Sequence, residues 1–382
     1  MSEPSPKTGD RNRGLHPVVW IALTVVALWI LYKIFLALWF FGAIKMPFVK
    51  DSPIKEKIHL SDFSPDGNKL YLDYCDTTRH CNIGQFDRLT QKASLFVPQG
   101  TQDTIASPSS SDDGKQLAIV IKEAANNYDT SQIGILDLAT NTYSAVTKSS
   151  TFKEWPSFSH DGKKIIYAQS NRKRKSGKTR HSEWDIYEME LATGAERRLT
   201  NFCFFVIDRP QYMVDNKRFV FSGEPTCNFP NQGSADSYKA YQKQYQDNTV
   251  FVMSGDETTL KPLVISGDLS SGAALTRDGL KIFFEAITNK MDNSKEFNYN
   301  IDLFTYEEGK IHRVTNLKTF LSDYAISAHG EWVAYLSDEQ RNHNYVLWIM
   351  DVAAGTHSKI NLGEHNSFTV TNIINQPKGE QK

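Results

Sequence analysis

The residues that could carry out chemistry in this chain lie far apart and form no familiar catalytic pattern. His80, His181 and His343 could hold a metal ion for a lyase reaction, but their separation does not resemble that of metal ligands. A Gly-Lys-Thr sequence at 177–179 lacks the upstream glycine of a phosphate-binding loop, and no Gly-x-Ser-x-Gly elbow is present. We therefore predict a non-enzymatic protein without catalytic residues, metal or cofactor, with the metal-dependent lyase as an alternative.

The composition sets few limits on partners. The 382 residues carry a formal net charge of −1, which gives no reason to expect nucleic acid as a ligand. Four cysteines are compatible with reduced thiols in the cytosol or with two disulfides in an exported protein. The sequence has no Asn-x-Ser/Thr sequon, which favours a bacterial envelope over a eukaryotic secretory route.

The N-terminal segment is expected to anchor the protein in a membrane. Residues 1–16 predict a disordered tail, and residues 17–44 form an apolar run interrupted by one charge, Lys33. This run exceeds the roughly 20 residues that span a bilayer, and it lacks the cleavage site of a signal peptide. Basic residues flank both ends, so charge does not fix the orientation. The large C-terminal part favours a single-pass protein of the inner (cytoplasmic) membrane, with its folded part in the periplasm.

A pattern that recurs about every fifty residues sets the fold. Each copy places an Asp-Gly, His-Gly or Asn turn before a nearly continuous apolar run. The turn supplies the positive φ of a tight hairpin, and the run is typical of a strand covered on both faces. The copies lie at residues 63–72, 110–119, 158–167, 213–221, 275–284 and 326–335.

Two further strands follow the paired strands of each copy, one of mixed pattern such as 185–191 and one short and polar such as 197–200. Four antiparallel strands repeated six times predict an all-β fold, a six-bladed β-propeller preceded by one N-terminal transmembrane helix. We assign 45–57 to a linker, 58–364 to the propeller and 365–382 to a C-terminal tail or closing strand. Residues 368–371 and 54–58 compete for the strand that closes the ring.

The Phe-Ser-Pro-Asp-Gly turn at 63–67, taken with Asp-Ile-Tyr at 185–187 and Thr-Gly-x-x-x-x-Leu-Thr at 193–200, resembles the repeat of TolB-type, WD40-like β-propellers. The resemblance covers roughly residues 58–361 and implies the propeller fold. TolB itself carries an additional α/β domain and a cleaved signal, which this sequence lacks. Relatives of prolyl oligopeptidase place such a propeller before a serine hydrolase, whose elbow is absent. The resemblance therefore concerns the propeller part only, not TolB itself.

We expect partners to bind the face that carries the long loops, because loops on a rigid scaffold commonly carry binding residues. The opposite face has only tight Asp-Gly turns. Cys75 and Cys81 fall in one long loop, while Cys203 and Cys227 lie in adjoining connections of the same face. Disulfides Cys75–Cys81 and Cys203–Cys227 are therefore plausible, with unpaired thiols as the alternative. The long loops are predicted at 73–82, 122–131, 170–183, 222–248, 286–300 and 337–344.

Two sets of residues on this face are candidate binding sites. A basic run in the loop at 170–183 could contact anionic lipid or an acidic protein, or could simply be solvated. It consists of Arg172, Lys173, Arg174, Lys175, Lys178 and Arg180. The second set should ring the axial funnel, where a ligand could bind or where ion pairs could join the blades. It consists of Asp62, Glu154, Trp155, Asp208, Arg209, Asp323 and Tyr324.

The leading functional hypothesis is a membrane-anchored interaction scaffold of the cell envelope. It would bind other envelope or membrane proteins through the long-loop face. A propeller that binds an oligosaccharide or a peptide in the axial funnel is the second hypothesis, and an enzyme is the third.

Overall fold

The structure, a computed structural model, describes Trp29, Tyr32, Lys33 and residues 57–78, 80–124, 129–173, 181–226, 249–255, 260, 262–263, 270–290, 299–339, 344–360 and 369–374. The chain divides into two compact units, Met1–Ile54 and Lys55–Lys382. In the first, the Lys33 ammonium lies 5.5 Å from the ring of Trp29. No helix within the described part of the chain is long and apolar enough to cross a bilayer. Most of the predicted anchor at 17–44 lies outside the described residues.

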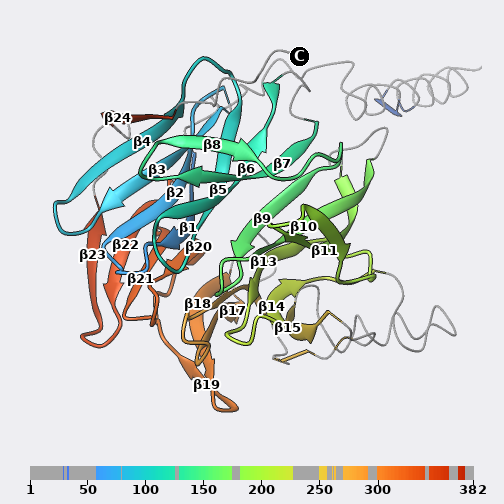
Figure 1. The fold of residues 1–382 in the computed structure, drawn as a ribbon. Coiled ribbons are helices and arrows are strands. Elements are labelled where there is room, and N and C mark those ends of the chain that lie inside the picture. Colours follow the sequence, from blue (N-terminus) through green and yellow to red (C-terminus); the bar gives the residue numbers. More distant parts are fainter. Residues whose placement is uncertain are drawn as a thin grey trace, which may run out of the picture. The chain divides into compact units, whose positions relative to one another are not determined.

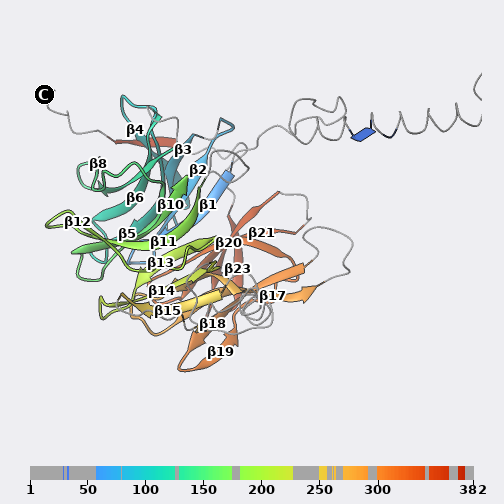
Figure 2. The ribbon, with the colours of Figure 1, turned by 90° about the vertical axis from the view of Figure 1, so that its right-hand side faces the viewer.

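The second unit confirms the predicted six-bladed β-propeller (Figure 1, Figure 2). Blade 1 contains β1 (Lys57–Phe63), β2 (Lys69–Cys75), β3 (Cys81–Asp87) and β4 (Lys92–Pro98). Blade 2 contains β5 (Thr104–Ser110), β6 (Gln116–Lys122), β7 (Ser131–Asp137) and β8 (Thr142–Ala145). Blade 3 contains β9 (Lys153–Phe158), β10 (Lys164–Lys173), β11 (His181–Glu190) and β12 (Ala195–Arg198). Blade 4 contains β13 (Ile207–Tyr212), β14 (Arg218–Gly223) and β15 (Thr249–Ser254). Blade 5 contains β16 (Ser270–Leu275), β17 (Ile282–Lys290), β18 (Tyr299–Glu307) and β19 (Lys310–Arg313). Blade 6 contains β20 (Phe320–Ile326), β21 (Trp332–Asp338), β22 (Val346–Asp351) and β23 (Thr356–Ile360).

The first strand of each blade lines the axis of the ring. β1, β5, β9, β13, β16 and β20 each contact the next, and β20 contacts β1. Blade 1 and blade 6 are both built from consecutive strands, so the closing junction between them forms by packing rather than through a shared sheet. In addition, β24 (Thr369–Ile374) joins the outer edge of blade 1 and runs parallel to β4. The C-terminal segment is therefore an outer strand, while the chain enters the ring through β1.

Three details differ from the expected four-stranded blades and long loops. Blade 1 has five strands, whereas blade 4 has three among the described residues and only a bridge between Phe251 and Pro262 beyond them. Both ends of the loop predicted at 170–183 belong to strands, because β10 runs to Lys173 and β11 begins at His181. The two strands form one long hairpin in which these two residues pair.

Apolar clusters hold neighbouring blades together, one at each of the six interfaces. On β6, Leu117 and Ile119 face blade 1, whereas Ala118 and Val120 face blade 3. This alternation confirms that the apolar run after each turn is a strand covered on both faces. At the closing junction, the same kind of cluster joins blade 1 to blade 6. The hydrophobic effect thus closes the ring without requiring a strand from each chain end in one blade.

Every axial strand carries a bulge near its middle. In blades 2 to 5 the bulge contains a residue with positive φ, and in blades 2 to 4 a proline follows it. These residues are Ser107, Trp155, Arg209 and Gly272, followed by Pro108, Pro156 and Pro210. Because proline has no N–H to donate to a ladder, it suits a bulge better than a regular strand. The bulges direct side chains into the axis.

The residues that carry the family resemblance form polar clusters inside single blades. In blade 5, Asp302 accepts hydrogen bonds from Thr315 Oγ1 (2.8 Å) and Leu317 N (2.7 Å) and an ion pair from Arg313 (2.6 Å). In blade 3, Asp185 makes the equivalent contacts with Thr200, Phe202 and Arg198. Both carboxylates are inaccessible to solvent. They fix the third strand of the blade to the connection that follows the fourth, so their role is structural.

We expect Asp302→Ala to lower the free energy of unfolding by about 3 kcal/mol, because it leaves buried donors without an acceptor. The matched control is Asp351→Ala in an exposed hairpin turn, where the carboxylate accepts one hydrogen bond from Ala354 N. That change should cost less than about 1 kcal/mol. Urea denaturation followed by fluorescence measures both values. If both variants lose the same free energy of unfolding, the buried Asp302 cluster stabilises the blade no more than an exposed turn does.

Candidate functional site

Charged side chains lie along the propeller axis on both sides of the bulges. Each axial strand begins on the side of the long loops and ends at a tight turn, so its early residues face the loop side. Glu154 and Asp208 therefore lie on the loop side, Arg209 lies at the bulge, and Asp62 lies nearer the Asp-Gly turns.

Arg209 ties three blades together at the bulge level. Its guanidinium extends from blade 4 and donates to Leu60 O (2.9 Å) in blade 1 and to Tyr324 O (2.5 Å) in blade 6. It also pairs with Asp323 (2.5 Å), which in turn accepts a hydrogen bond from Leu60 N (2.7 Å). Arg209 is 9% exposed. Although burial opposes it, the nearby Asp323 carboxylate raises the pKa of Arg209, so the tie stays charged.

Two aromatic rings flank this guanidinium. The rings of Trp155 and Tyr324 lie 5.7 Å and 5.3 Å from the Arg209 Cζ atom. The Tyr324 hydroxyl donates to Gly272 O in blade 5. Four of the predicted funnel residues thus meet at one place, and they bind one another rather than leaving free polar groups. The structure favours the interpretation that they are ion pairs and hydrogen bonds between blades.

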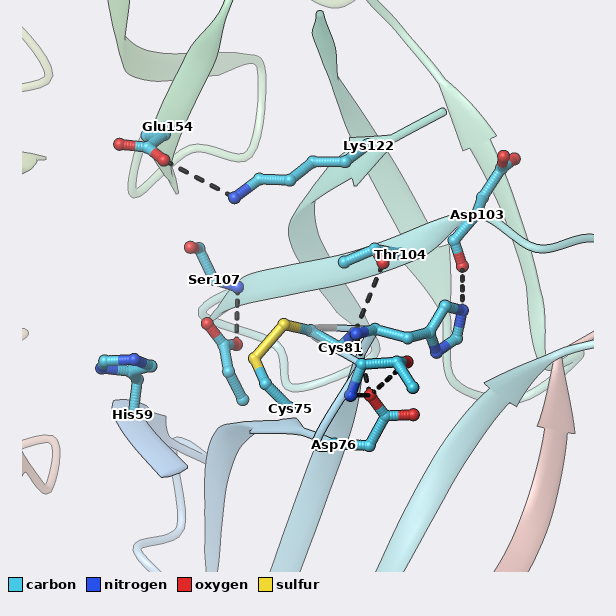
Figure 3. Close-up of a disulfide and its surroundings, with 12 residues drawn as sticks. His59, Cys75, Asp76, Cys81, Asp103, Thr104, Ser107, Lys122 and Glu154 are labelled. Atoms are coloured by element: carbon cyan, nitrogen blue, oxygen red, sulfur yellow. Dashed lines mark hydrogen bonds and ion pairs between the residues drawn. A yellow bond between two sulfur atoms is a disulfide. The ribbon is translucent and has the colours of Figure 1, made fainter. Parts of the chain in front are cut away.

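On the loop side of Arg209 the carboxylates outnumber the cations. We name Asp73, Glu154, Asp208, Glu285 and Asp323 the axial acidic cluster. Among the described residues, two cations lie against this cluster. Lys122 lies 3.6 Å from Glu154 (Figure 3). Arg209 pairs with Asp323. The His59 ring lies 3.8 Å from Asp323 and is 53% exposed, so the mouth of the axis is open to solvent. The cluster thus holds more carboxyl groups than neighbouring cations.

Two members of the cluster, Glu285 and Asp73, have raised pKa values. Burial raises the pKa of Glu285 to about 8, and the Asp323 carboxylate adds to the shift. Burial also raises the pKa of Asp73 to about 7, although Ser107 N donates to it (2.7 Å). The two residues occupy the same position in the second strands of blades 5 and 1. Each retains a proton at higher pH than an exposed carboxylate, chiefly because burial disfavours its charged form and secondarily because carboxylates lie nearby.

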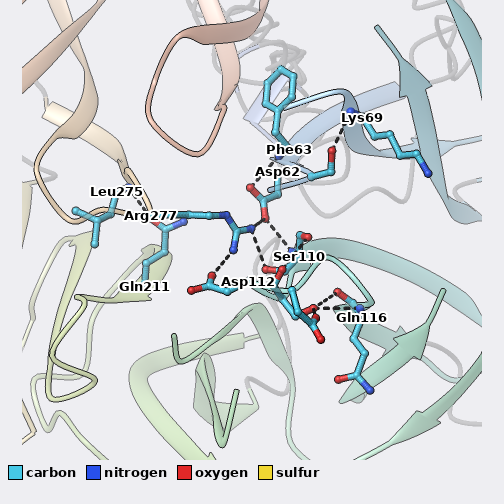
Figure 4. Close-up of polar contacts among 12 residues, drawn as sticks. Asp62, Phe63, Lys69, Ser110, Asp112, Gln116, Gln211, Leu275 and Arg277 are labelled. Carbon is cyan, nitrogen blue, oxygen red and sulfur yellow. Dashed lines mark hydrogen bonds and ion pairs between the residues drawn. The ribbon is translucent and has the colours of Figure 1, made fainter. Parts of the chain in front are cut away.

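A second polar network lies at the Asp-Gly face, where we expected little (Figure 4). Arg277 extends from the turn of blade 5 to Ser110 O (3.0 Å) and the Asp112 carboxylate in blade 2, and to Asp62 (3.4 Å) in blade 1. His160 of blade 3 contacts Asp112 (2.8 Å). The predicted funnel residue Asp62 belongs to this network and accepts a hydrogen bond from Ser110 N (2.8 Å). Positive and negative charges balance here.

A small pocket, partly open to solvent, is lined by residues of both networks. Its walls are formed by Ser61, Asp62, Ser107, Trp155, Arg209 and their neighbours on β5, β9 and β13. The Ser61 hydroxyl is buried and has no hydrogen-bond partner in the described part of the chain. Ordered water commonly fills such a polar space.

The other predicted residues lie around the edge of the loop face. Cys75 and Cys81 form a disulfide across paired positions of β2 and β3 (Figure 3). Cys203 is also disulfide-bonded, while Cys227, its predicted partner, lies outside the described residues. Arg172 pairs with Glu183 (2.9 Å), and Lys173 ends β10. The rest of the predicted basic run, Arg174, Lys175, Lys178 and Arg180, lies outside the described residues.

The histidines of the alternative metal site make other contacts. The His80 ring lies 3.1 Å from Asp103 O, and the His181 ring stacks on Phe152 with centroids 4.1 Å apart. His343 lies outside the described residues. Within the described ranges, no group of three or more His, Cys, Asp or Glu residues is arranged to hold a metal ion.

Comparison with known proteins identifies the propeller type, although no protein-family model matches the chain. "Tol-Pal system protein TolB" of Francisella tularensis subsp. holarctica (strain OSU18) is 23% identical over 300 residues, covering 74% of this chain and 56% of that protein. TolB from Acinetobacter baumannii superposes with a TM-score of 0.50 at 20% identity, covering 81% of this chain and 64% of the other. The propeller is of the TolB type.

This TolB-type propeller chain spans about half the length of the curated relatives it matches. A solved "oligogalacturonate lyase in complex with manganese" also superposes, with a TM-score of 0.51 at 14% identity, covering 80% of this chain and 78% of the other. At such low identity the likeness shows the fold alone. Because proteins of different function share the fold, the site has to carry the functional assignment.

The charge state of Glu285 predicts how the stability of the TolB-type propeller depends on pH. The folded protein keeps a proton on Glu285 up to about pH 8, while the unfolded chain loses it near the ordinary pKa of 4.5. The free energy of unfolding should therefore fall as pH rises between these values. Glu285→Gln should reduce this fall, because its amide does not ionise.

Thermal melts from acidic to mildly alkaline pH, run on the wild type and on Glu285→Gln, test this prediction. Glu308→Gln, in an exposed turn of the same blade, makes the same change of charge and should follow the wild type. If the slopes of Glu285→Gln and the wild type coincide, Glu285 does not carry the unusual proton.

Proposed function

We propose that this TolB-type propeller is a non-catalytic interaction protein of the bacterial cell envelope, which binds another envelope or membrane protein through the long-loop face. The curated relatives are named as Tol-Pal system proteins, which supports a role in protein interaction. The Cys75–Cys81 disulfide supports an oxidising compartment such as the periplasm.

The observation that carries this proposal is the excess of carboxylates in the axial acidic cluster. Glu285 and Asp73 keep their protons up to about pH 8 and 7, and a positively charged group placed beside them would favour their ionised forms, so its binding would be coupled to loss of these protons. Lys122 and Glu154 are partly exposed, with 26% and 32% of their side-chain surface accessible, and His59 is open to solvent. A lysine or arginine from a docked protein can therefore approach the cluster. The partner we infer is a protein that presents a basic segment to the loop face.

The contacts of the aromatic rings disfavour the oligosaccharide alternative. A sugar site would need Trp155 or Tyr324 to offer a ring face to solvent. Tyr324 is fully buried and its hydroxyl is bonded to blade 5, while both rings flank Arg209. Lys122 and Glu154 are more accessible than the buried Tyr324 ring, which favours a basic peptide segment.

In this proposal residues 17–44 hold the propeller at the inner membrane, with the domain on the periplasmic side. The propeller begins at Lys57, so the residues from 45 to 56 could span at most about 40 Å when fully extended. Such a tether keeps the loop face near the bilayer or at its side. Basic residues between Arg172 and Arg180 could then contact anionic headgroups, each contributing about 1 kcal/mol.

The full chain should remain in the membrane fraction after alkaline carbonate extraction, because an apolar span is not released by loss of surface charge. Deleting residues 1–44 should move the protein to the soluble fraction. Immunoblots of both fractions measure the outcome. Complete extraction of the full chain would contradict a spanning anchor.

The triple variant Asp73→Asn/Glu154→Gln/Glu285→Gln replaces three carboxyl groups by amides that cannot ionise. We expect it to lose most of its partner crosslinks in native membranes. The yield should fall about tenfold if each carboxylate contributes a few tenths of a kcal/mol or more to binding. Crosslinking of the full chain followed by mass spectrometry measures the yield. Glu308→Gln is the control for a surface charge, and the melting temperature of each variant confirms folding. Undiminished crosslinks in the folded triple variant would reject the acidic cluster as the docking site.

A further inference from the structure

The outer strand of blade 1 differs from the outer strands of the other blades. β4 has seven residues, whereas β8, β12, β19 and β23 have four or five. Leu95 and Phe96 of β4 are buried, while β12 and β19 are exposed throughout. A long apolar edge strand is a ready template for pairing with another strand, so it must be covered.

The covering strand is β24, and its pairing is unusual for this fold. Residues 369–374 run parallel to β4, with Thr369 opposite Ser94 and Ile374 opposite Pro98. All other ladders between named strands of the described residues are antiparallel. Parallel pairing is slightly less stable for each residue.

Among the strands that the structure describes, β24 pairs with β4 alone. It is the last strand of its sheet, and β4 is its neighbour there. β4 also forms an antiparallel ladder with β3, in which Asp87 pairs with Lys92 at one end and Ile83 with Phe96 at the other. β24 can therefore leave without breaking any other strand pair, and its departure exposes a preformed edge.

Blade 1 also lacks the polar cluster that ends the fourth strand elsewhere. Asn82 precedes Ile83 on β3, in the place where Asp185 stands in blade 3 and Asp302 in blade 5. Its carbonyl oxygen is buried and has no hydrogen-bond partner within the described residues. β4 continues through Val97 and Pro98 instead of ending in the Arg-x-Thr sequence of the other two blades. In blade 1 an added strand takes the place of that internal cluster.

We propose that the outer edge of β4 is a binding site for an extended peptide strand, occupied by β24 of the same chain and open to β24 of a second copy by exchange. Every copy carries both the edge and the strand that fits it, in a register that the intramolecular pairing already defines. Exchange would join two propellers without changing any blade.

The test uses the full chain with a specific protease site placed between β23 and β24, in residues 361–368, and cut after folding. The probe is a fluorescent peptide of residues 365–378. Before the cut, the tethered strand acts at an effective concentration of the order of millimolar and excludes the probe. After the cut we expect saturable binding that is at least about tenfold tighter than to uncut protein. Unlabelled peptide should compete.

Two controls distinguish strand pairing from nonspecific binding of the probe. A peptide with Val370→Pro and Asn372→Pro cannot form the ladder and should not bind. A chain with the protease site placed after residue 374 keeps its tethered strand when cut and should bind no more probe than uncut protein. Equal binding by cut and uncut chains, equal binding of the proline peptide, or no binding after the cut would each overturn the proposal.

Exchange between copies is tested with two full chains that carry different affinity tags. They are mixed at high concentration, and we expect each tag to recover the other chain. Val370→Pro/Asn372→Pro in both chains should abolish this recovery while leaving the melting transition of the blades in place. Undiminished recovery by the proline variant would show that contacts other than β24 join the copies.

Discussion

In a ring of six sheets the first and last blades must be joined, although their strands come from opposite ends of the chain. Here the junction between blades 6 and 1 is made by an apolar cluster and by the hydrogen bonds of one arginine. Arg209 belongs to blade 4, on the far side of the axis, and bonds to Leu60 and Tyr324 on the two sides of the junction. These axial polar groups therefore hold the ring closed, and a partner can bind only to axial groups that do not take part in closure.

On the loop side the axis contains more carboxyl groups than cations, and two of these groups keep a proton at unusually high pH. Arg209 satisfies Asp323, but Glu285 and Asp73 remain near it with raised pKa values. On the Asp-Gly side, Arg277 is matched by Asp62 and Asp112, so no comparable excess arises. The difference between the two ends of the axis gives the propeller a polarity that its near-sixfold repeat does not have. A basic partner would distinguish one face from the other by charge alone.

The six tight turns made the fold predictable from the sequence. Turn chemistry and an apolar run recur together, and no other arrangement buries both faces of six such strands. The meeting of Arg209, Asp323, Trp155 and Tyr324 was also predictable, because each stands early in an axial strand. A proline follows the bulge residue in three axial strands, at Ser107-Pro108, Trp155-Pro156 and Arg209-Pro210. These steps in the sequence indicate the bulges.

Other features could not be read from local sequence. Glu285 and Asp73 stand inside apolar runs, where a charge is an anomaly, but their environment depends on side chains from three other blades. Whether residues 368–371 would close the ring from within or pair outside depended on the length of β4, which is set by tertiary contacts. The extension of β10 to Lys173 and the start of β11 at His181 carry no alternating apolar pattern that would mark them as strands in the sequence.

The central claim, a cluster of buried carboxyl groups that keep their protons beside a closed axis, is tested most directly by carboxyl NMR of the full protein in detergent micelles. Selective labelling of Glu and Asp side chains, with Glu285→Gln and Asp73→Asn for assignment, gives the titration midpoint of each group. The account predicts that Glu285 titrates at about 8 and Asp73 at about 7. Midpoints for both at the ordinary values near 4 would show that neither group keeps its proton, and the proposed basis for binding a basic partner would fall.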